Sequence, residues 1–314
     1  MLNKWQKELA RITGKADKAT EKRLKSIFEK TLKTLEFEME DLLSQDKIKF
    51  WQLFRASTLQ DMQSQVNSVL YENYEEIMNE SLSYLQLKQQ LGWDEVFYDA
   101  TQHLNIDFNR VDLNQAYSLA NFSEDELAER LSENLYSNTE QLAGRVVNRL
   151  DNTLLTGVSS QKIAKELMPD IKDVLQKELN TEYNKAIRIV RTESTRVSGT
   201  AKQNSMEHAE SLGIEAKKMW VSSLDNRTRG SHQHLDGQVV GIDEEFEVNG
   251  STAKAPGGFG VAEEDIHCRC KVVTLIEDNK PITRRVSVYD EEGNKTGTEL
   301  VNYKTYEEWS EAKH

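Results

Sequence analysis

Two histidines and two cysteines are the side chains of this 314-residue chain whose types and spacing most readily suggest chemistry. His232 and His234 are separated by one residue, and so are Cys268 and Cys270. Imidazole and thiolate are ligands that zinc prefers, so these four side chains could form a zinc site. However, zinc fingers space their cysteines as C-x₂₋₄-C, and residues one apart in a strand point to opposite faces. We therefore predict no bound metal and no other cofactor, with zinc as the alternative.

Acidic side chains in the same region could support a hydrolytic reaction. In a metal nuclease, His232 or His267 would act as the base, and Asp225 or Asp236 would bind the metal ion. Both aspartates are equally suited to turns, because they lie in an Asp-Asn and an Asp-Gly dipeptide. We predict no catalytic residue. The alternative is a metal-dependent nuclease or a toxin-like hydrolase that uses the two histidines and two cysteines.

Arginines next to these aspartates could bind phosphate or could pair with acids. Arg227 and Arg229 carry planar guanidinium groups suited to phosphate, but 53 acidic residues outnumber 40 basic ones in the chain. A buried arginine needs a carboxylate or carbonyl partner. We therefore predict a structural hub that pins the turn after Trp220 to the Cys-Arg-Cys segment. Its members are Asp225, Arg227, Arg229, His232, Asp236, Cys268 and Cys270.

Composition excludes several classes of protein. Apolar residues make up 37% and charged residues 30% of the chain, which favours long solvated helices over one large buried sheet. Five Trp, ten Tyr and nine Phe are too many for a wholly disordered chain. No apolar run is long enough to span a membrane, so we expect no membrane partner. The net charge of −13 argues against a protein that coats nucleic acid.

Glycine and proline divide the chain into two parts. Only four of fifteen glycines precede residue 180, and all three prolines follow residue 168. Because both residues interrupt regular structure, we expect long helices up to about residue 180. Apolar stripes at helical spacing run from Leu24 to Leu35 and from Ile163 to Leu175. A further helix should run from about residue 181 to 212 and end at Gly213.

The pattern changes after Gly213 to that of short strands and turns. Residues 214–221 and 270–276 are typical of strands. Hairpin turns are predicted at Asp236-Gly237, at Asn249-Gly250 and over 291–294, and a short helix over 305–311. The predicted fold class is α+β, with a long helical N-terminal region followed by a small α+β module with a mixed or antiparallel sheet. The predicted domains are residues 1–180, 181–278 and 279–314.

The N-terminal segment is locally basic in an acidic chain. Its first 33 residues contain ten basic and four acidic side chains. Such a segment could contact DNA phosphates or an acidic partner, and a solvated helix face is the alternative. The candidate DNA contacts are Lys4, Lys7, Arg11 and Lys15. We expect binding to double-stranded DNA to be weak and without sequence specificity.

A series of short motifs lies in order between about residues 185 and 277. The motifs are Arg191-Thr192-Glu193, Lys218-Met219-Trp220, Asp225-x-Arg227-Thr228-Arg229-x-x-His232, Leu235-Asp236-Gly237, Phe246, Pro256 and Cys268-Arg269-Cys270. This order resembles the phage Mu protein F-like family of minor head proteins, also called the head morphogenesis family. His267 is a departure, because the family often has asparagine before Cys-Arg-Cys and so does without a histidine there.

The resemblance implies a structural and DNA-handling role. It implies a minor capsid protein in the virion interior, present in the host cytoplasm during assembly, that binds the portal protein and influences DNA packaging or ejection. Scaffold and major capsid proteins are further candidate partners. Some members of the family carry a toxin domain after this module, but only about 37 residues remain from Asp278 onward, and we expect none here. The resemblance assigns structural roles to Arg191, Glu193, Trp220, Asp225, Arg227, Arg229, His232, Asp236, Gly237, Cys268 and Cys270.

Overall fold

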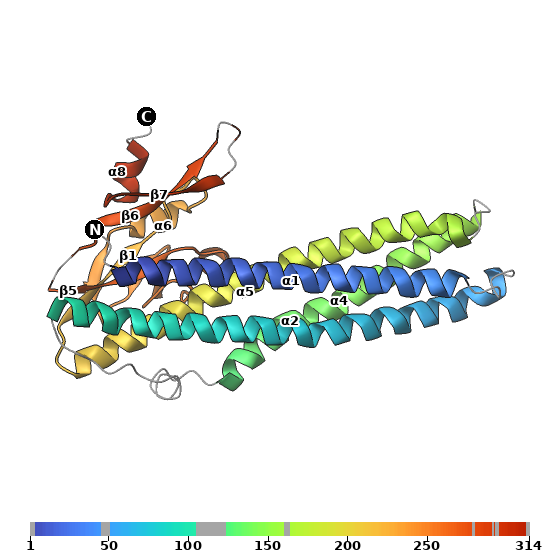
Figure 1. Ribbon diagram of the computed structural model, residues 1–314, viewed down its shortest axis with the longest axis horizontal. Helices are drawn as coiled ribbons and strands as arrows, with labels where there is room; N and C mark the ends of the chain where they lie inside the picture. The colour runs from blue at the N-terminus through green and yellow to red at the C-terminus, as the bar shows by residue number, and fades with distance from the viewer. Residues whose placement is uncertain are drawn as a thin grey trace. The chain divides into compact units, whose positions relative to one another are not determined.

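The computed structural model describes residues 4–44, 51–104, 124–159, 164–277, 280–290, 292 and 295–311. Long helices come first in the chain: α1 (Lys4–Ser44), α2 (Trp51–Leu104), α4 (Glu124–Ser159) and α5 (Ala164–Ser211) (Figure 1). Short elements follow: β1 (Ala216–Val221), α6 (Gly230–Leu235), β2 (Val239–Gly241), β3 (Phe246–Val248), β4 (Ser251–Ala253), α7 (Ala262–Asp265), β5 (Lys271–Ile276), β6 (Thr283–Tyr289), β7 (Lys295–Asn302) and α8 (Tyr306–Glu311). The predicted α+β class is therefore confirmed. No helix within these ranges has an apolar stretch long enough to cross a lipid bilayer.

Helix α5 is a single helix of 48 residues, where the sequence predicted one helix over 163–175 and another over about 181–212. The prediction of two helices was wrong because neither glycine nor proline occurs between residues 170 and 198. Pro169 lies near the N-terminal end of α5, where it removes one hydrogen bond without ending the helix.

The predicted C-terminal end of this helix is confirmed. Gly213 adopts a φ of +88°, in the left-handed region that glycine enters without steric cost. The amides of Gly213 and Ile214 donate to the carbonyls of Glu210 and Ala209 over 2.8 and 3.1 Å. These two bonds form a Schellman motif, which satisfies the last carbonyls of the helix.

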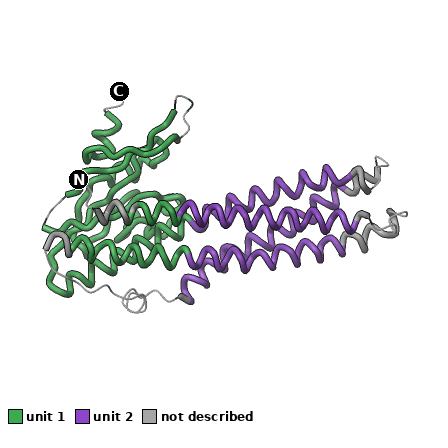
Figure 2. The backbone as a smooth tube through the Cα atoms, in the orientation of Figure 1, with its two compact units in different colours: residues 1–16, 84–124, 191–314 green, residues 17–83, 125–190 purple. Residues whose placement is uncertain are grey.

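The chain forms two compact units, which Figure 2 colours separately. Unit 1 comprises residues 1–16, 84–124 and 191–314, and unit 2 comprises residues 17–83 and 125–190. Helices α1, α2 and α5 each contribute residues to both units. The predicted domain boundaries near residues 180 and 278 stay a prediction.

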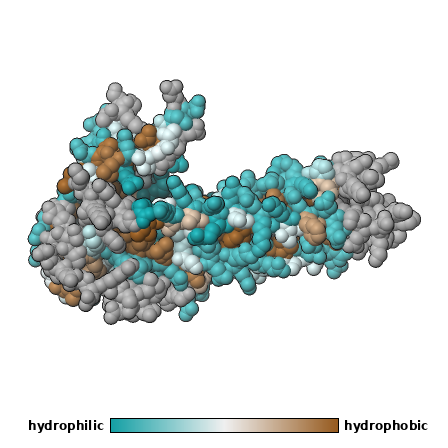
Figure 3. All heavy atoms as spheres, viewed as in Figure 1, coloured by the Kyte–Doolittle hydropathy of each residue, from teal (hydrophilic) through white to brown (hydrophobic). Residues whose placement is uncertain are grey.

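Unit 2 is helical throughout its described residues, and its apolar stripes bury one another. Leu24 and Leu35 of the predicted stripe are fully buried. Helix α4 is joined to α5 by Arg145, whose Nε and Nη2 lie 2.9 and 2.7 Å from carboxylate oxygens of Glu178 and Glu182. Hydrophilic residues predominate along these helices on the face shown in Figure 3, as expected when the apolar stripes point inward.

Unit 1 contains a three-stranded antiparallel sheet of order β2-β1-β5. Strand β1 lies in the centre, where Met219 pairs with Val239 on one side and with Val273 on the other. Strands β3 and β4 form the hairpin predicted at Asn249-Gly250, and both turn residues have positive φ, 50° and 76°. Strands β6 and β7 pair antiparallel, as the hairpin predicted over 291–294 requires, and residues 291, 293 and 294 of its turn lie outside the described residues.

The hairpin predicted at Asp236-Gly237 is wrong. Residues 230–235 form the short helix α6, and Gly237, with a φ of +82°, lets the chain turn from this helix directly into β2. A glycine with positive φ serves both a helix end and a hairpin turn. The dipeptide alone therefore could not distinguish the two.

One face of α5 holds the segment that contains the cysteines. Thr195 Oγ1 donates to the carbonyl of Cys268 over 2.9 Å, and Thr192 Oγ1 accepts from the amide of His267 over 3.2 Å. Residues three apart in a helix lie on one face, so both threonines reach the same segment. The motif Arg191-Thr192-Glu193 thus contributes to the fold through its middle residue.

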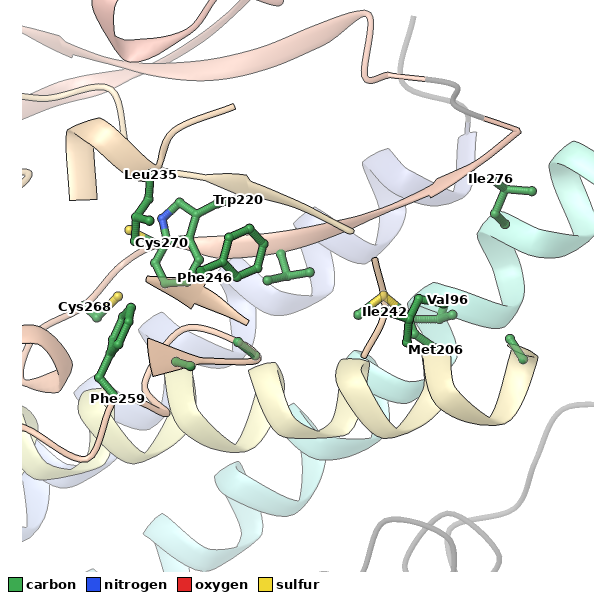
Figure 4. Close-up of a cluster of buried hydrophobic side chains, with 14 of the residues drawn as sticks. Val96, Met206, Trp220, Leu235, Ile242, Phe246, Phe259, Cys268, Cys270 and Ile276 are labelled. Atoms are coloured by element: carbon green, nitrogen blue, oxygen red, sulfur yellow. The ribbon is translucent and has the colours of Figure 1, made fainter. Parts of the chain in front are cut away.

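The core of unit 1 lies between this helix and the strands. Trp220 and Phe246 contact each other edge to face, with ring centroids 5.1 Å apart, and are 0% and 1% exposed. Figure 4 shows Met206 of α5 and Val96 of α2 in the same buried cluster. These contacts fix the strands against the helix, and so they fix the turns at the strand ends.

Substitution of Gly199 tests how closely the segment at Pro256 packs on α5. A Cβ atom at this position would lie 2.7 Å from the carbonyl oxygen of Pro256, so Gly199→Ala should destabilise unit 1 by about 1–3 kcal/mol through overpacking. Gly14, also helical and in unit 1, has no atom within 4 Å of such a Cβ. Gly14→Ala should therefore stabilise by about 0.5–1 kcal/mol. Urea unfolding measures both, and equal effects of the two substitutions would contradict this packing.

Candidate functional site

Asp225 is a buried carboxylate in the turn after β1, and an arginine from the Cys-Arg-Cys segment holds it. The Asp225 side chain is 1% exposed. Both terminal nitrogens of Arg269 donate to it, Nη2 to Oδ1 over 2.7 Å, and the amide of Arg227 donates to Oδ1 over 3.0 Å. Burial alone would raise the pKa of Asp225, but the hydrogen bonds and charge of Arg269 outweigh burial and lower that pKa. The carboxylate is therefore ionised, and its oxygens accept hydrogen bonds from Arg269 and from the amide of Arg227.

Asp236 is a second buried carboxylate with its own arginine. The side chains of Asp236 and Arg284 are 0% and 5% exposed. Nη1 and Nη2 of Arg284 donate to Oδ2 and Oδ1 over 2.8 and 3.0 Å. The amides of Ser222 and Tyr306 donate to the same carboxylate over 2.6 and 2.7 Å. Asp236 therefore links the end of β1 to β6 and α8.

The two arginines considered for phosphate binding have different surroundings. Arg229 precedes α6, and its guanidinium donates to the carbonyls of Glu264, over 2.9 Å, and Ile266. Arg227 has a side chain that is 69% exposed, with Nη2 4.0 Å from Asp225 Oδ2. Arg229 is thus committed to the backbone around α7, whereas Arg227 reaches solvent.

Three of the four predicted zinc ligands meet in the core of unit 1. His232, Cys268 and Cys270 are 2%, 4% and 5% exposed. Nδ1 of His232 lies 3.6 Å from Sγ of Cys268 and 3.3 Å from Sγ of Cys270. The three donor atoms lie within 4.8 Å of one another, and both thiols are free. Figure 4 shows the two cysteines at the end of the core that also holds Phe259.

The other nitrogen of the His232 ring faces Glu264, which is 3% exposed. Nε2 lies 3.0 Å from Oε2, although the ring N–H is not aligned well enough for an ordinary hydrogen bond. Ser231 and Asn249 each donate to this carboxylate over 2.8 Å. Burial would raise the pKa of Glu264, but these two hydrogen bonds, together with the charges of His232 and Arg229, outweigh burial and lower the pKa. A charged carboxylate is therefore directed at the histidine.

The two thiols differ in acidity because they hydrogen-bond to each other. The hydrogen bond from Cys268 lowers the pKa of Cys270 against the effect of burial, and the contact with His232 lowers it further. The same hydrogen bond, together with burial, raises the pKa of Cys268. Cys270 is therefore the sulfur that more readily becomes a thiolate, the form that binds metals.

Other predicted site residues lie outside this cluster. His234 is exposed on α6, because residues two apart in a helix point to different sides. His267 adopts a positive φ of 58°. On α5, Arg191 is exposed, whereas Glu193 is buried with its Oε2 2.6 Å from Nη2 of Arg196. Among the candidate DNA contacts of α1, Arg11 and Lys15 are exposed. The side chains of Lys4 and Lys7 lie outside the described part of the chain.

Sequence reasoning did not single out three residues that complete these arrangements. Arg269 could have been found, because in an extended segment it must face away from the two buried cysteines beside it. Glu264 resembled its neighbours in the acidic run of α7. Arg284 gave no local signal, since its partner Asp236 is 48 positions away.

Comparison with known proteins identifies the segment that carries this geometry. Residues 145–273 match the family model described as Phage Mu protein F like protein. This segment is a Mu F-like module. It contains every motif from Arg191 to Cys270, so the resemblance seen in the sequence is confirmed. The match begins at Arg145, 46 residues before Arg191, and thus includes the last part of α4 and all of α5.

The relatives with curated names match this chain over part of their own length. The chain is 30% identical over 312 residues to NAD(+)--arginine ADP-ribosyltransferase EFV of Enterococcus faecalis, covering 98% of this chain and 60% of that protein. It is 31% identical over 165 residues to Minor head protein GP7 of Bacillus phage SPP1, covering 52% of each. It is also 32% identical over 158 residues to the uncharacterized protein YqbB of Bacillus subtilis, covering 49% of this chain and 47% of that protein. The chain therefore spans about half to three-fifths of these relatives. No solved structure matches it.

Asp225 and its two neighbouring arginines provide a matched test of the structural role of the motif. Asp225→Ala leaves the Arg269 guanidinium, whose side chain is 37% exposed, and the Arg227 amide without their acceptor, and should cost about 1.5–3 kcal/mol of stability. Arg229→Ala should also destabilise, because two backbone carbonyls lose their donor. Arg227→Ala removes an exposed side chain and should change stability by less than about 1 kcal/mol. Thermal unfolding of the three variants decides, and an Asp225→Ala variant as stable as Arg227→Ala would exclude the structural role.

Proposed function

We propose that this protein is a phage minor head protein that lies inside the procapsid, binds the portal protein and assists head assembly, DNA packaging or DNA ejection. The observation that carries the proposal is the similarity to Minor head protein GP7 of Bacillus phage SPP1, supported by the Mu F-like match over residues 145–273. Such a protein would be present in the host cytoplasm during assembly and in the interior of the capsid afterwards.

The surroundings of the motif residues favour a structural protein over an enzyme. Asp225 and Asp236, which a nuclease would use as metal ligands, are each occupied by an arginine and by backbone amides. His232, the candidate base, is 2% exposed, so a macromolecular substrate could not reach its ring. The side chains that the sequence suggested for catalysis therefore face other residues of the protein and not solvent.

The helical N-terminal half is our candidate for the portal contact, although not through its apolar stripes. Amphipathic helices must bury their stripes against a partner or against each other, and in unit 2 they bury each other. Unit 2 exposes a tyrosine patch instead, formed by Tyr71, Tyr74 and Tyr136. The ring centroid of Tyr136 lies 5.8 Å from those of both other tyrosines, and Tyr71 and Tyr136 are 37% and 42% exposed. Tyrosine is enriched in protein interfaces.

Co-expression with the portal protein of the same genome tests this partner. The two proteins should co-purify as a complex and be found together in procapsids. Tyr71→Ala with Tyr136→Ala should weaken the complex at least about tenfold if the patch is a hot spot worth about 2 kcal/mol. Phe37→Ala, which removes an exposed aromatic side chain of unit 2 outside the patch, is the control. Absence of the protein from procapsids and virions would refute the proposed function. If only Phe37→Ala weakened the complex, the tyrosine patch would not be the portal contact.

The basic N-terminal segment supports a weak contact with DNA. Arg11 and Lys15 are exposed on α1, and phosphate neutralisation by such side chains releases counterions without reading sequence. The acidic charge of the whole chain, −13, limits this contact to a local one. Scaffold or major capsid protein could be further partners within the head.

Fluorescence anisotropy with duplex DNA at several salt concentrations measures this contact. Binding should weaken steeply with salt, by a slope of about −0.9 per phosphate neutralised, and should not depend on DNA sequence. Changing Lys4, Lys7, Arg11 and Lys15 to Glu should remove most of it. The same charge change at the exposed residues Lys177, Lys217, Lys271 and Lys280 is the control. Unchanged affinity of the N-terminal variant at low salt would show that the segment is only a solvated helix face.

An enzymatic role is the alternative that the comparisons raise. One relative is named an NAD(+)--arginine ADP-ribosyltransferase, and this chain covers 60% of it. We propose that the chain itself is neither a transferase nor a nuclease. Incubation with NAD⁺ and an arginine-containing acceptor should give no transfer, and incubation with DNA and Mg²⁺, Mn²⁺ or Zn²⁺ should give no cleavage. Either reaction, at a rate proportional to protein concentration, would contradict this view.

A further inference from the structure

We propose that His232, Cys268 and Cys270 bind one zinc ion that braces α6 against the segment leading into β5. The proposal does not depend on the function proposed above. It replaces the ligand set that the sequence suggested, because His234 is exposed on α6 whereas the other three donors converge in the core. One imidazole and two sulfurs are a ligand set typical of zinc.

The two distances from the imidazole nitrogen to the sulfurs suit zinc. Zinc binds sulfur at about 2.3 Å and imidazole nitrogen at about 2.0–2.1 Å in a tetrahedron. Those bond lengths place a nitrogen and a sulfur ligand about 3.5 Å apart. Nδ1 of His232 lies 3.6 and 3.3 Å from the two sulfurs. An ion at their centre would replace weak N···S contacts by bonds to all three donors.

Glu264 provides a second and independent observation that points to a metal. Histidines that bind metal ions usually donate their other ring N–H to a carboxylate, which fixes the tautomer and raises the basicity of the ligand nitrogen. Here Nε2 of His232 lies 3.0 Å from Glu264 Oε2, although its N–H is not aligned as in an ordinary hydrogen bond. A proton on Nε2, next to this carboxylate, leaves the lone pair of Nδ1 for the ion. Ser231 and Asn249 hold the carboxylate in place. Glu264 is therefore a positioning residue for the histidine.

Burial assigns this ion a structural rather than a catalytic role. Zinc sites with three protein ligands keep one position for water or substrate, but all three donors here are at most 5% exposed. A substrate could not reach the fourth position, whereas a water could fill it. The ion would enter as the chain folds, when the ligands from α6 and from the β5 side come together.

Elemental analysis and cobalt substitution of the full chain test the proposal. The protein expressed with zinc in the medium should contain one zinc ion per chain after desalting. Protein unfolded with chelator and refolded with Co²⁺ should show thiolate-to-cobalt charge transfer and the intense visible bands of a tetrahedral site. Addition of chelator to the zinc form should lower its thermal midpoint, and Zn²⁺ should restore it.

Variants separate metal binding from folding. Cys268→Ser and Cys270→Ser preserve shape and should abolish the charge-transfer band, whereas His234→Ala should leave metal content unchanged. Glu264→Gln should retain one zinc ion at saturation but bind it about 10–100-fold more weakly. A folded wild-type protein that contains no zinc after incubation with Zn²⁺ would overturn the proposal. So would a stoichiometric content of another metal, or two thiols lost to a disulfide.

Discussion

Burying two ionised carboxylates is the constraint on which the Mu F-like module depends. Asp236 is 0% exposed, so its charge must be compensated by the protein, and one arginine and two amides provide the compensation. Those donors come from β6, from the end of β1 and from α8. Satisfying one carboxylate therefore fixes three segments that are distant in sequence. Asp225 is compensated in the same way by Arg269, and this pair fixes the Cys-Arg-Cys segment. Each pair is costly to break, because loss of its arginine would leave a buried carboxylate without a charged partner.

The residues that look catalytic in the sequence owe their placement to this constraint. Once Arg269 faces Asp225, the cysteines on either side of it must face the opposite way, into the core. They meet His232 there because α6 begins directly after the turn that Asp225 organises. His232, Cys268 and Cys270 therefore come together as the ligands of a metal centre would, in a core that no substrate can enter.

The sequence predicted the elements well where the signal is local. The β3-β4 turn at Asn249-Gly250, the end of α5 at Gly213 and strand β5 all follow from neighbouring residues, and the structure has them. The prediction at Asp236-Gly237 failed because the same dipeptide can end a helix or form a hairpin turn. The prediction of two helices failed because α5 continues without a break between the two predicted segments. The site was harder to predict. Pairing of Asp236 with Arg284 spans 48 positions, and no composition or spacing rule links residues that only the folded chain brings together.

A double-mutant cycle on Asp236 and Arg284 tests most directly the claim that the motif residues serve one another rather than a substrate. The free energy of unfolding is measured for the wild type, for Asp236→Asn, for Arg284→Leu and for the double variant. Each single change should cost several kcal/mol, and the double variant should be about as stable as either single one. The coupling energy should then equal the cost of one single change, about 3 kcal/mol. Additive losses, with a coupling energy near zero, would show that the buried pair does not hold the module together.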